Sequence, residues 1–310
     1  MKAIAYSRYG GPEVMERTDV PMPVVPPGHG LVKIHAASIN PVDWKLRSGM
    51  LRFVTGRKFP RIMGADLSGT LTEINGDGAG LKIGDAVCGF APPLQPPGSL
   101  AEYCIVPLNR LAHAPPELSM TEAAALPLVS VTAHAALFKV GGLRAGQKLL
   151  VVGAAGGVGH VAVQMAKAHG AEVTATCRTN AMSFVKGLGA DVVIDYTAQD
   201  ILDCGEVFDL ILDTSGTLPF RKAKRIMKSH GIFLDPDLKF KNFLFGMIGK
   251  RYRPVMADVL RTEIEKVIPM LAAGSLKLTI GEVFNFKGAV SVITAIEEGR
   301  SIRGKAVFVI

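Results

Sequence analysis

Three glycines in one short turn are the residues of this chain best suited to hold a ligand. They are Gly156, Gly157 and Gly159. They lie between the apolar run Leu149–Val152 and the helix-forming run Val158–Ala168, an order that places backbone amides where they can bind a pyrophosphate. The pattern predicts a dinucleotide site in which Ala154 takes the place of the first glycine of the usual fingerprint and Val158 completes the turn. The alternative is an ordinary joint between a strand and a helix.

The next expected strand, Glu172–Cys177, indicates which dinucleotide the turn would bind. An NAD-selective enzyme usually ends this strand with an Asp or Glu that binds the ribose 2′-hydroxyl. This chain has neither, and Arg178 stands there instead, where a guanidinium can pair with a 2′-phosphate. We therefore predict NADPH as the cofactor, with Asn180 and Tyr196 as further candidates for its adenosine end. The alternative for Arg178 is a surface side chain that caps a loop.

The segments after this turn alternate between strands and helices. Strands are expected at 191–194, 208–213 and 231–234, with helices at 180–188 and 219–228, and a helix expected at 119–140 leads into the whole alternating region. Strand–helix alternation at this spacing predicts an α/β fold with a doubly wound parallel sheet.

The first 125 residues have a different pattern, with much Gly and Pro and several short strand candidates. The candidates are 3–6, 30–36, 68–74, 84–89 and 101–106. Turn signals such as Asn75–Gly78 separate them, which is typical of a small antiparallel, barrel-like domain. The tail adds a helix at 257–273, bent before Pro269, then a helix at 289–298 and a strand at 305–310.

Composition and charge narrow the function classes. The chain has 310 residues, 48% of them hydrophobic, and a net charge of +8. These values suit a globular protein of one or two domains that binds an anionic cofactor. No apolar run is long enough to span a membrane and residues 1–20 do not resemble a signal peptide, so we expect a cytoplasmic protein. The four cysteines are too far apart for a redox pair or a zinc knuckle.

The densest basic stretch, 239–253, alternates cationic and aromatic residues. Its cationic members are Lys239, Lys241, Lys250, Arg251 and Arg253. Such a mixture suits RNA or a membrane surface. We expect instead a mobile loop over the substrate or a dimer contact, and no nucleic-acid partner, because the other basic residues are scattered along the chain.

Short motifs in a fixed order carry a family resemblance along nearly the whole chain. They are Ala37–Asp43, Arg47–Gly49, Gly64–Gly69, Gly84–Val87, Gly98–Tyr103, Leu126–Pro127, Val131–Ala133, Ala162–Lys167, Leu188–Asp191, Asp195–Tyr196 and Arg303–Lys305. The ordered set resembles the medium-chain dehydrogenase/reductase superfamily, in its zinc-independent quinone oxidoreductase branch of zeta-crystallin-like proteins and alkenal/enone reductases. The resemblance implies a GroES-like, β-barrel-type catalytic domain at 1–125 and 256–310, and a Rossmann domain that binds NADP(H) at 126–255.

The resemblance also bears on metals. Zinc-using relatives place Cys, His and Cys at positions matched here by Asn40, Ala65 and about Leu128, none of which is a usual zinc ligand. The cysteines of the structural-zinc lobe are missing from 91–98, so we expect no metal. Without a Lewis acid the acceptor must already be electrophilic, which favours quinones and α,β-unsaturated carbonyls as substrates.

The motif that enters the family's active site is matched by Asn40 and Asp43. Lys45 stands where many relatives have a tyrosine that points at the substrate, and it can donate to an oxyanion or deliver a proton. The alternatives are a solvated lysine on a helical turn and an Asp43 that only caps that turn. Thr132 matches a position near the nicotinamide, or packs inside a helix, and Arg300 is a candidate for the 2′-phosphate end.

Three functions remain open from the sequence. The first is an NADPH-dependent quinone or enone reductase. The second is an enoyl-thioester reductase in which Lys239, Lys241 and Arg251 meet a phosphopantetheine or coenzyme A phosphate. The third is a non-catalytic scaffold or RNA-binding protein that keeps NADPH binding. The family usually forms homodimers through edge strands of the cofactor domain, and we expect one here, with 208–213 and 231–234 as candidate strands.

Overall fold

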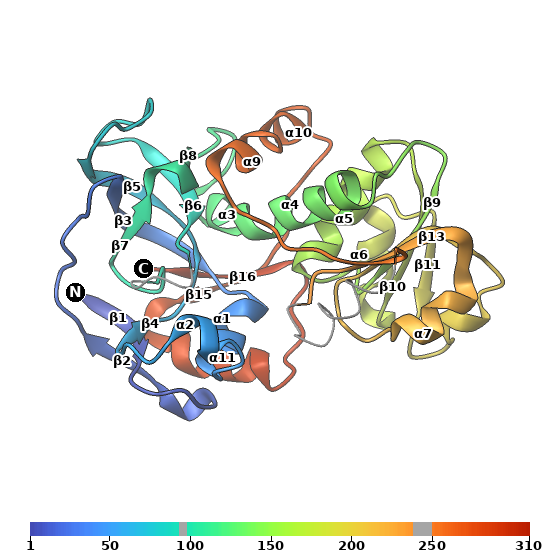
Figure 1. Cartoon of the computed structure of the whole chain (residues 1–310), viewed down its shortest axis with the longest axis horizontal. Helices are drawn as coiled ribbons and strands as arrows, with labels where there is room; N and C mark the ends of the chain where they lie inside the picture. The colour runs from blue at the N-terminus through green and yellow to red at the C-terminus, as the bar shows by residue number, and fades with distance from the viewer. Residues whose placement is uncertain (93–97, 238–249) are drawn as a thin grey trace. The chain divides into compact units, whose positions relative to one another are not determined.

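The computed structural model describes residues 1–92, 98–237 and 250–310, which form two units (Figure 1). Unit 1 comprises Met1–Leu128, Val259–Ile268 and Ile280–Ile310, and unit 2 comprises Val129–Asp258 and Pro269–Thr279. The sequence-based division at 125/126 and 255/256 differs from these units by three residues at each boundary and in the segment 269–279. This segment belongs to unit 2 because two of its backbone amides, at Lys277 and Thr279, donate to Gln164 Oε1 and His160 Nε2 at 2.9 and 3.2 Å.

The described residues of unit 2 form one parallel sheet of six strands. They are β9 (Lys148–Val152), β10 (Glu172–Cys177), β11 (Val192–Asp195), β12 (Phe208–Asp213), β13 (Met227–Asp235) and β14 (Tyr252–Pro254). Their spatial order is β11-β10-β9-β12-β13-β14, which is the Rossmann order with its switch point beside the first strand. In the part of unit 2 that the structure describes, the strands alternate with the helices α5 (Gly157–Ala168), α6 (Met182–Gly187) and α7 (Phe220–Ala223). The predicted doubly wound sheet is confirmed.

Two expectations for unit 2 are wrong. The helix expected at 219–228 stops early, because a turn of 3-10 helix at Lys224–Ile226 follows α7 and β13 already begins at Met227. The strands proposed as sheet edges lie inside the sheet: β12 pairs with β9 and β13, and β13 also pairs with β14. All six residues of β12 are buried, as expected for a central strand. In the described part of the chain, the edges are β11 and β14.

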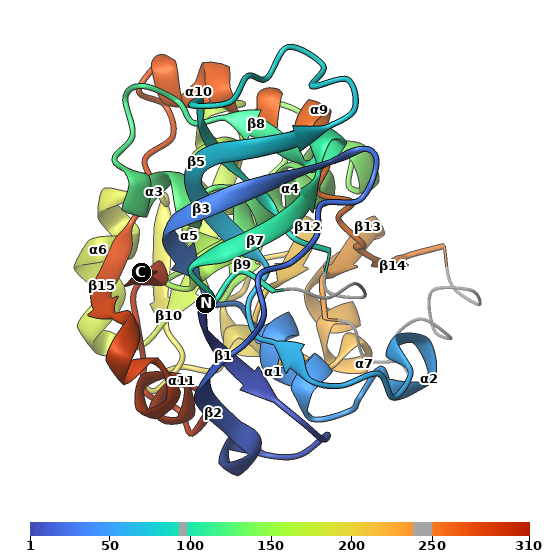
Figure 2. The same cartoon turned by 90° about the vertical axis from the view of Figure 1, so that its left-hand side faces the viewer.

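Unit 1 is built mainly from antiparallel strands around the long strand β3 (His29–Ser38). Its larger sheet adds β15 (Ile280–Asn285), β16 (Lys305–Val309), β5 (Asp66–Asn75), β6 (Ala86–Phe90), β7 (Tyr103–Pro107) and β8 (Leu111–His113). Figure 2 shows β3 between β5 and β7, with which it pairs. A smaller sheet holds β1 (Lys2–Tyr6), β2 (Met15–Asp19) and β4 (Arg61–Ile62). One apolar core covers both sheets, and Ile4, Leu67 and Phe308 are among its fully buried members.

Proline residues divide two of the expected helices. The stretch 119–140 contains α3 (Met120–Ala125), α4 (Pro127–His134) and a π-helical segment, Ala135–Val140. The stretch 257–273 contains α9 (Arg261–Glu265) and α10 (Ile268–Ala272). Pro127 begins α4 and Pro269 lies in the first turn of α10, since a proline has no amide proton to continue a preceding helix.

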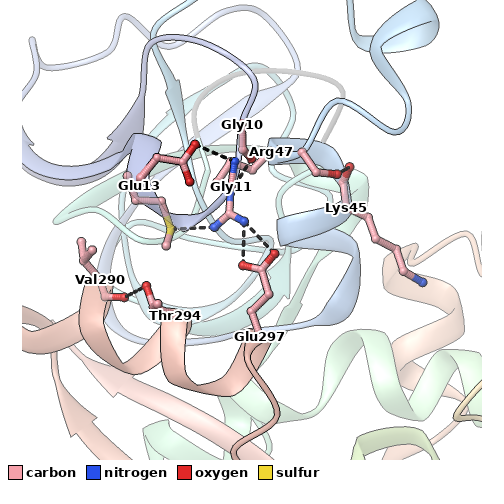
Figure 3. A network of polar contacts seen from close by, with 10 residues as sticks. Gly10, Gly11, Glu13, Lys45, Arg47, Val290, Thr294 and Glu297 are labelled. Atoms are coloured by element: carbon pink, nitrogen blue, oxygen red, sulfur yellow. Dashed lines mark hydrogen bonds and ion pairs between the residues drawn. The ribbon is translucent and has the colours of Figure 1, made fainter.

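A partly buried ion pair links two helices of unit 1 that are far apart in sequence. Arg47 ends α1 (Pro41–Arg47) and is fully buried, while Glu297 ends α11 (Ala289–Glu297). Arg47 Nη2 donates to both carboxylate oxygens of Glu297, at 2.8 and 2.6 Å. Its Nη1 approaches the sulfur of Met15 at 3.3 Å (Figure 3). This charge-assisted contact of one guanidinium nitrogen with both carboxylate oxygens links the C-terminal ends of α1 and α11.

Candidate functional site

The glycine turn lies where β9 ends and α5 begins. Gly156 caps α5, and its amide donates to the Gly153 carbonyl at 3.1 Å. A Cβ at Gly159 would lie 2.3 Å from the Gly153 oxygen and 2.7 Å from the Ala154 Cα. Gly159 is therefore a glycine because the helix packs directly against the backbone of the turn, which is one of the roles glycine has in dinucleotide-binding turns.

The exposed side of this turn fits a pyrophosphate. A Cβ at Gly156 would meet only the Gly153 oxygen, at 3.4 Å, so the backbone is open to a ligand. Gly157 and Val158 are half-exposed and lie in the first turn of α5, which contains no acidic residue. The first amides of a helix have no partner within the helix and carry its positive dipole end. An anionic group can therefore bind them directly.

Sequence reasoning missed the glycine that makes the turn possible. Gly153 has a φ of +80°, and a Cβ there would lie 2.9 Å from Thr214 Oγ1. Thr214, which follows β12, donates this hydroxyl to the Val152 and Gly153 carbonyls at 2.8 and 3.1 Å. Ala154, given the place of the first glycine, is fully buried, and its amide donates to Thr176. The available signal was a glycine directly after an apolar strand.

The candidates for the adenosine end gather where β10 and β11 end. Arg178 follows β10, and its Nε donates to the hydroxyl of Tyr196, just after β11, at 2.7 Å. Both side chains are exposed, as is Asn180 in the following turn. Asp195, the last residue of β11, is a carboxylate that sequence reasoning did not weigh, and Thr179 donates to it at 2.5 Å. The hydroxyls of Thr179 and Thr197 lower the pKa of Asp195, so the carboxylate stays ionised.

Two other candidates have different surroundings. Thr132 is buried in α4. Arg300 belongs to unit 1, where its Nη2 donates to Glu282 at 2.5 Å and its guanidinium lies over the ring of Phe284, 5.3 Å from the centroid. Because Arg300 already contacts these neighbours in its own unit, we do not include it in the proposed cofactor site.

A buried polar cluster lies where β3 ends and α1 begins. Asn40 Nδ2 donates to Asp66 Oδ2 at 2.9 Å, and the Asn40 backbone amide donates to Asp43 Oδ2 at 2.7 Å. The ammonium of Lys305 in β16 donates to the Ile39 carbonyl at 2.8 Å and to Asn40 Oδ1. Asn40, Asp43, Asp66 and Lys305 are all buried. Sequence reasoning placed Asn40 and Asp43 here but gave Asp66 and Lys305 no role.

Burial dominates the electrostatics of this cluster. It raises the pKa of the Asp43 carboxyl to about 7, an effect that the hydrogen bond from Asn40 opposes and the charge of Asp66 reinforces. Burial also raises the pKa of Asp66 and lowers that of Lys305, and the mutual attraction of these two groups opposes both shifts. The cluster therefore holds its charges only because each has a close partner of opposite sign or a hydrogen bond.

Lys45 lies on a different side of α1 from Asp43. Residues two positions apart on a helix do not share a face, and Asp43 is buried whereas Lys45 is half-buried. Figure 3 shows the Lys45 side chain pointing away from the Arg47–Glu297 ion pair. The helix thus presents an ammonium group on one side while its other sides are fixed by buried polar contacts.

Comparisons with known proteins agree with this architecture. Residues 26–116 match the alcohol dehydrogenase GroES-like domain, and residues 188–308 match the zinc-binding dehydrogenase family. The NAD(P)H oxidoreductase RTN4IP1, mitochondrial, of Danio rerio is 34% identical, over 99% of this chain and 90% of that protein. The quinone-oxidoreductase QR1, chloroplastic, of Triphysaria versicolor is 33% identical, over 93% of this chain and 92% of that protein. The chain belongs to the medium-chain dehydrogenase/reductase superfamily, in its quinone oxidoreductase branch.

Two further members extend the comparison. The 2-methylene-furan-3-one reductase of Solanum lycopersicum is 35% identical, over 99% of this chain and 78% of that protein. The structure of the quinone oxidoreductase from Coxiella burnetii matches with a TM-score of 0.92 at 30% identity, over 100% of this chain and 99% of that one. This member of the quinone oxidoreductase branch is therefore an enzyme, an oxidoreductase with the predicted GroES-like and Rossmann folds.

The positions that hold zinc in metal-using relatives have other contacts in this chain. Asn40 binds Asp66 and Lys305, Ala65 is fully buried, and the Leu128 amide donates to Asp66 at 3.0 Å. Over the described residues, no group of three or more His, Cys, Asp or Glu residues could hold a metal ion. The absence of zinc stays a prediction from the sequence.

The basic stretch 239–253 lies partly outside the described residues, which exclude Lys239 and Lys241. Arg251 Nε and Nη2 donate to the Gly231 and Lys228 carbonyls at 3.0 and 2.6 Å. Arg253 lies in β14 and donates to the Val140 carbonyl at 2.9 Å. Arg251 thus binds β13, and Arg253 binds the end of the π-helical segment Ala135–Val140, both within unit 2. The strand β14 begins at the end of the expected loop 239–253, whose residues 239–249 lie outside the described part of the chain. No helix within 1–92, 98–237 or 250–310 has the length and apolar composition for crossing a membrane.

Asp43→Asn is expected to flatten the pH dependence of stability in this protein. The folded pKa of about 7 exceeds the ordinary value of 3.8, so the stabilising contribution is complete below about pH 4 and is lost as the pH rises through 7. At pH 8 the variant, whose amide oxygen still accepts from Asn40, should be more stable by about 2–4 kcal/mol. Urea unfolding from pH 4.5 to 8 measures this, with the exposed Asp77→Asn as the control. A variant less stable than wild type at pH 8 would contradict it.

Proposed function

We propose that this chain is an NADPH-dependent reductase of quinones or α,β-unsaturated carbonyls. The observation that carries the cofactor choice is Arg178, paired with the hydroxyl of Tyr196 at the end of β10, where NAD-selective enzymes hold an acid. The acceptor class is supported by relatives named as quinone oxidoreductases and by the 2-methylene-furan-3-one reductase.

In this proposal, different residues bind the cofactor and the acceptor. The amides of Gly157, Val158 and Gly159 would hold the pyrophosphate, and Arg178 the 2′-phosphate, with Tyr196 orienting the guanidinium. The nicotinamide supplies a hydride when bound. Reduction of an enone or a quinone leaves negative charge on the acceptor oxygen, and the ammonium of Lys45 is the group we assign to stabilise it. Asn40 and Asp43 hold the start of α1, which carries Lys45.

The first experiment follows NADPH oxidation with a panel of quinones, an alkenal and an enoyl-coenzyme A, with NADH in parallel. Rapid turnover of quinones or the alkenal with NADPH supports the proposal. A preference for the enoyl-coenzyme A would favour an enoyl-thioester reductase. The described residues give that alternative little support, since Arg251 is bound to backbone carbonyls. NADPH binding without turnover of any acceptor would overturn the reductase assignment. Homodimer formation and a cytoplasmic location stay predictions from the sequence.

Arg178→Ala tests the cofactor assignment directly. Loss of a charge-assisted contact to the 2′-phosphate is worth about 1.5–3 kcal/mol, so the KM for NADPH should rise about tenfold to a hundredfold. The KM for NADH should stay within about twofold, since NADH has no phosphate there. Arg225→Ala, which removes another exposed arginine of unit 2, is the matched control. An equal rise in KM for both cofactors would show that Arg178 does not bind the 2′-phosphate.

A further inference from the structure

A lysine and an aspartate of unit 1 are buried against each other beside Asn40. Lys305 is 3% exposed and Asp66 is fully buried, and the Lys305 ammonium lies 3.7 Å from Asp66 Oδ2. Three neighbouring strands bring them together, since Ser38 of β3 pairs with Asp66 of β5 and with Val307 of β16. The two charges therefore flank the point where β3 ends and α1 begins.

Asn40 bridges the two charges in only one orientation of its amide. The Lys305 ammonium can only donate, and it donates to Asn40 Oδ1. The ionised Asp66 carboxylate can only accept, and it accepts from Asn40 Nδ2 at 2.9 Å. Rotating the amide by half a turn would set oxygen against carboxylate and nitrogen against ammonium. The pair thus selects one amide orientation and holds Asn40 at the start of α1.

Stability alone does not explain this arrangement. Burying two charges carries a large desolvation penalty, and apolar residues of similar volume often replace such pairs at no loss of stability. Asp66 also takes hydrogen bonds from Ser38 Oγ at 3.2 Å and from the Leu128 amide at 3.0 Å. Four groups thereby surround the Asn40 carboxamide directly or through Asp66: Ser38 of β3, Asp66 of β5, Lys305 of β16 and the Leu128 amide of α4. Such a network specifies geometry more than it adds stability.

We propose that Lys305 and Asp66 are positioning residues of the reduction: by orienting Asn40 they fix the first turn of α1 and so the place of the Lys45 ammonium. The backbone amide of Asn40 in turn donates to Asp43, so the position of Asn40 also fixes the third residue of the helix. The Arg47–Glu297 pair fixes the other end of α1. This inference rests on the proposed function, in which Lys45 stabilises the acceptor oxygen.

The test compares Lys305→Met, Asp66→Asn and the double variant in steady-state turnover of NADPH with a quinone. Each single variant leaves one buried charge without its partner and should unfold at lower urea concentration. The double variant removes both charges and should recover most of the stability. Its kcat should still fall about tenfold to a hundredfold, as expected for a displaced group. Its KM for NADPH should stay unchanged, because the glycine turn and Arg178 lie in unit 2.

Val307→Ala provides the control for a purely structural effect. Val307 is fully buried in β16, so its truncation destabilises unit 1 without removing a polar contact. A wild-type kcat in the stable double variant would overturn the proposal, as would an equal loss of kcat in Val307→Ala. If the wild type reduces no acceptor, the proposed function fails, and amide hydrogen exchange then decides the positioning role. Faster exchange at Asp43–Arg47 in the double variant than in Val307→Ala would support that role, and equal exchange would overturn it.

Discussion

Gly159→Val is expected to abolish dinucleotide binding. The new side chain would need space that the Gly153 oxygen and the Ala154 Cα already fill, at 2.3 and 2.7 Å from its Cβ. These are backbone atoms, so no rotamer change relieves the overlap, and α5 must move away from the end of β9. The amides that would bind the pyrophosphate then lose their positions, and a displacement of this kind costs about a hundredfold in function.

Isothermal titration with NADPH measures this effect. We expect the Kd to rise at least about a hundredfold, and overpacking to lower the free energy of unfolding by about 1–3 kcal/mol. Gly187→Ala is the matched control, because Gly187 lies in α6 with no atom within 4 Å of its added Cβ. This variant should bind normally and gain up to about 1 kcal/mol of stability. Binding by Gly159→Val within about threefold of wild type would contradict the assignment of the turn.

Lys45→Met should produce the largest loss in the chemical step. Removing one preorganised donor to a developing oxyanion typically lowers kcat about a hundredfold to a thousandfold. Methionine keeps the length and the apolar stem of the side chain while removing the charge. The KM for NADPH should change little, since Lys45 belongs to unit 1 and the proposed cofactor residues belong to unit 2.

The same kinetic assay includes Lys33→Met as its control. Lys33 is an exposed lysine of β3 in the same unit, so its replacement changes the net charge equally. Wild-type kcat in Lys33→Met together with the loss in Lys45→Met assigns the effect to position 45. An unchanged kcat in Lys45→Met would show that another donor stabilises the oxyanion and would refute the role proposed for this lysine.

Most strands of unit 2 could be predicted from the sequence, and the reason is physical. Strands such as Phe208–Asp213 and Glu172–Cys177 are short runs of strand-forming residues bounded by turn residues. Their structure therefore follows from neighbours that are close in sequence. The short strand β14 and the early end of α7 could not be predicted, because the pairing and the early start of β13 determine them. Local patterns carry no information on such contacts.

The candidate site shows the same limit. The turn at Gly156–Gly159 and the place of Arg178 could be predicted, because each is defined by its position after one strand. Lys305 donates to Asn40 across 265 residues of sequence, and no periodicity connects them. The only local sign was a lysine within an apolar strand, which is equally typical of a solvent-facing edge.

The composition of unit 1 has a consequence for synthesis on the ribosome. Its residues 1–128 emerge first, but β16 pairs with Ala36–Ser38 of β3, and Arg47 needs Glu297 as its counter-ion. The nascent chain therefore carries an unpaired strand edge and an unneutralised arginine while residues 129–279, which contain all of unit 2, are translated and can fold. Unpaired edges of this kind associate readily with other chains. Until residues 280–310 leave the exit tunnel, we expect unit 1 to depend on chaperone protection even when unit 2 is complete.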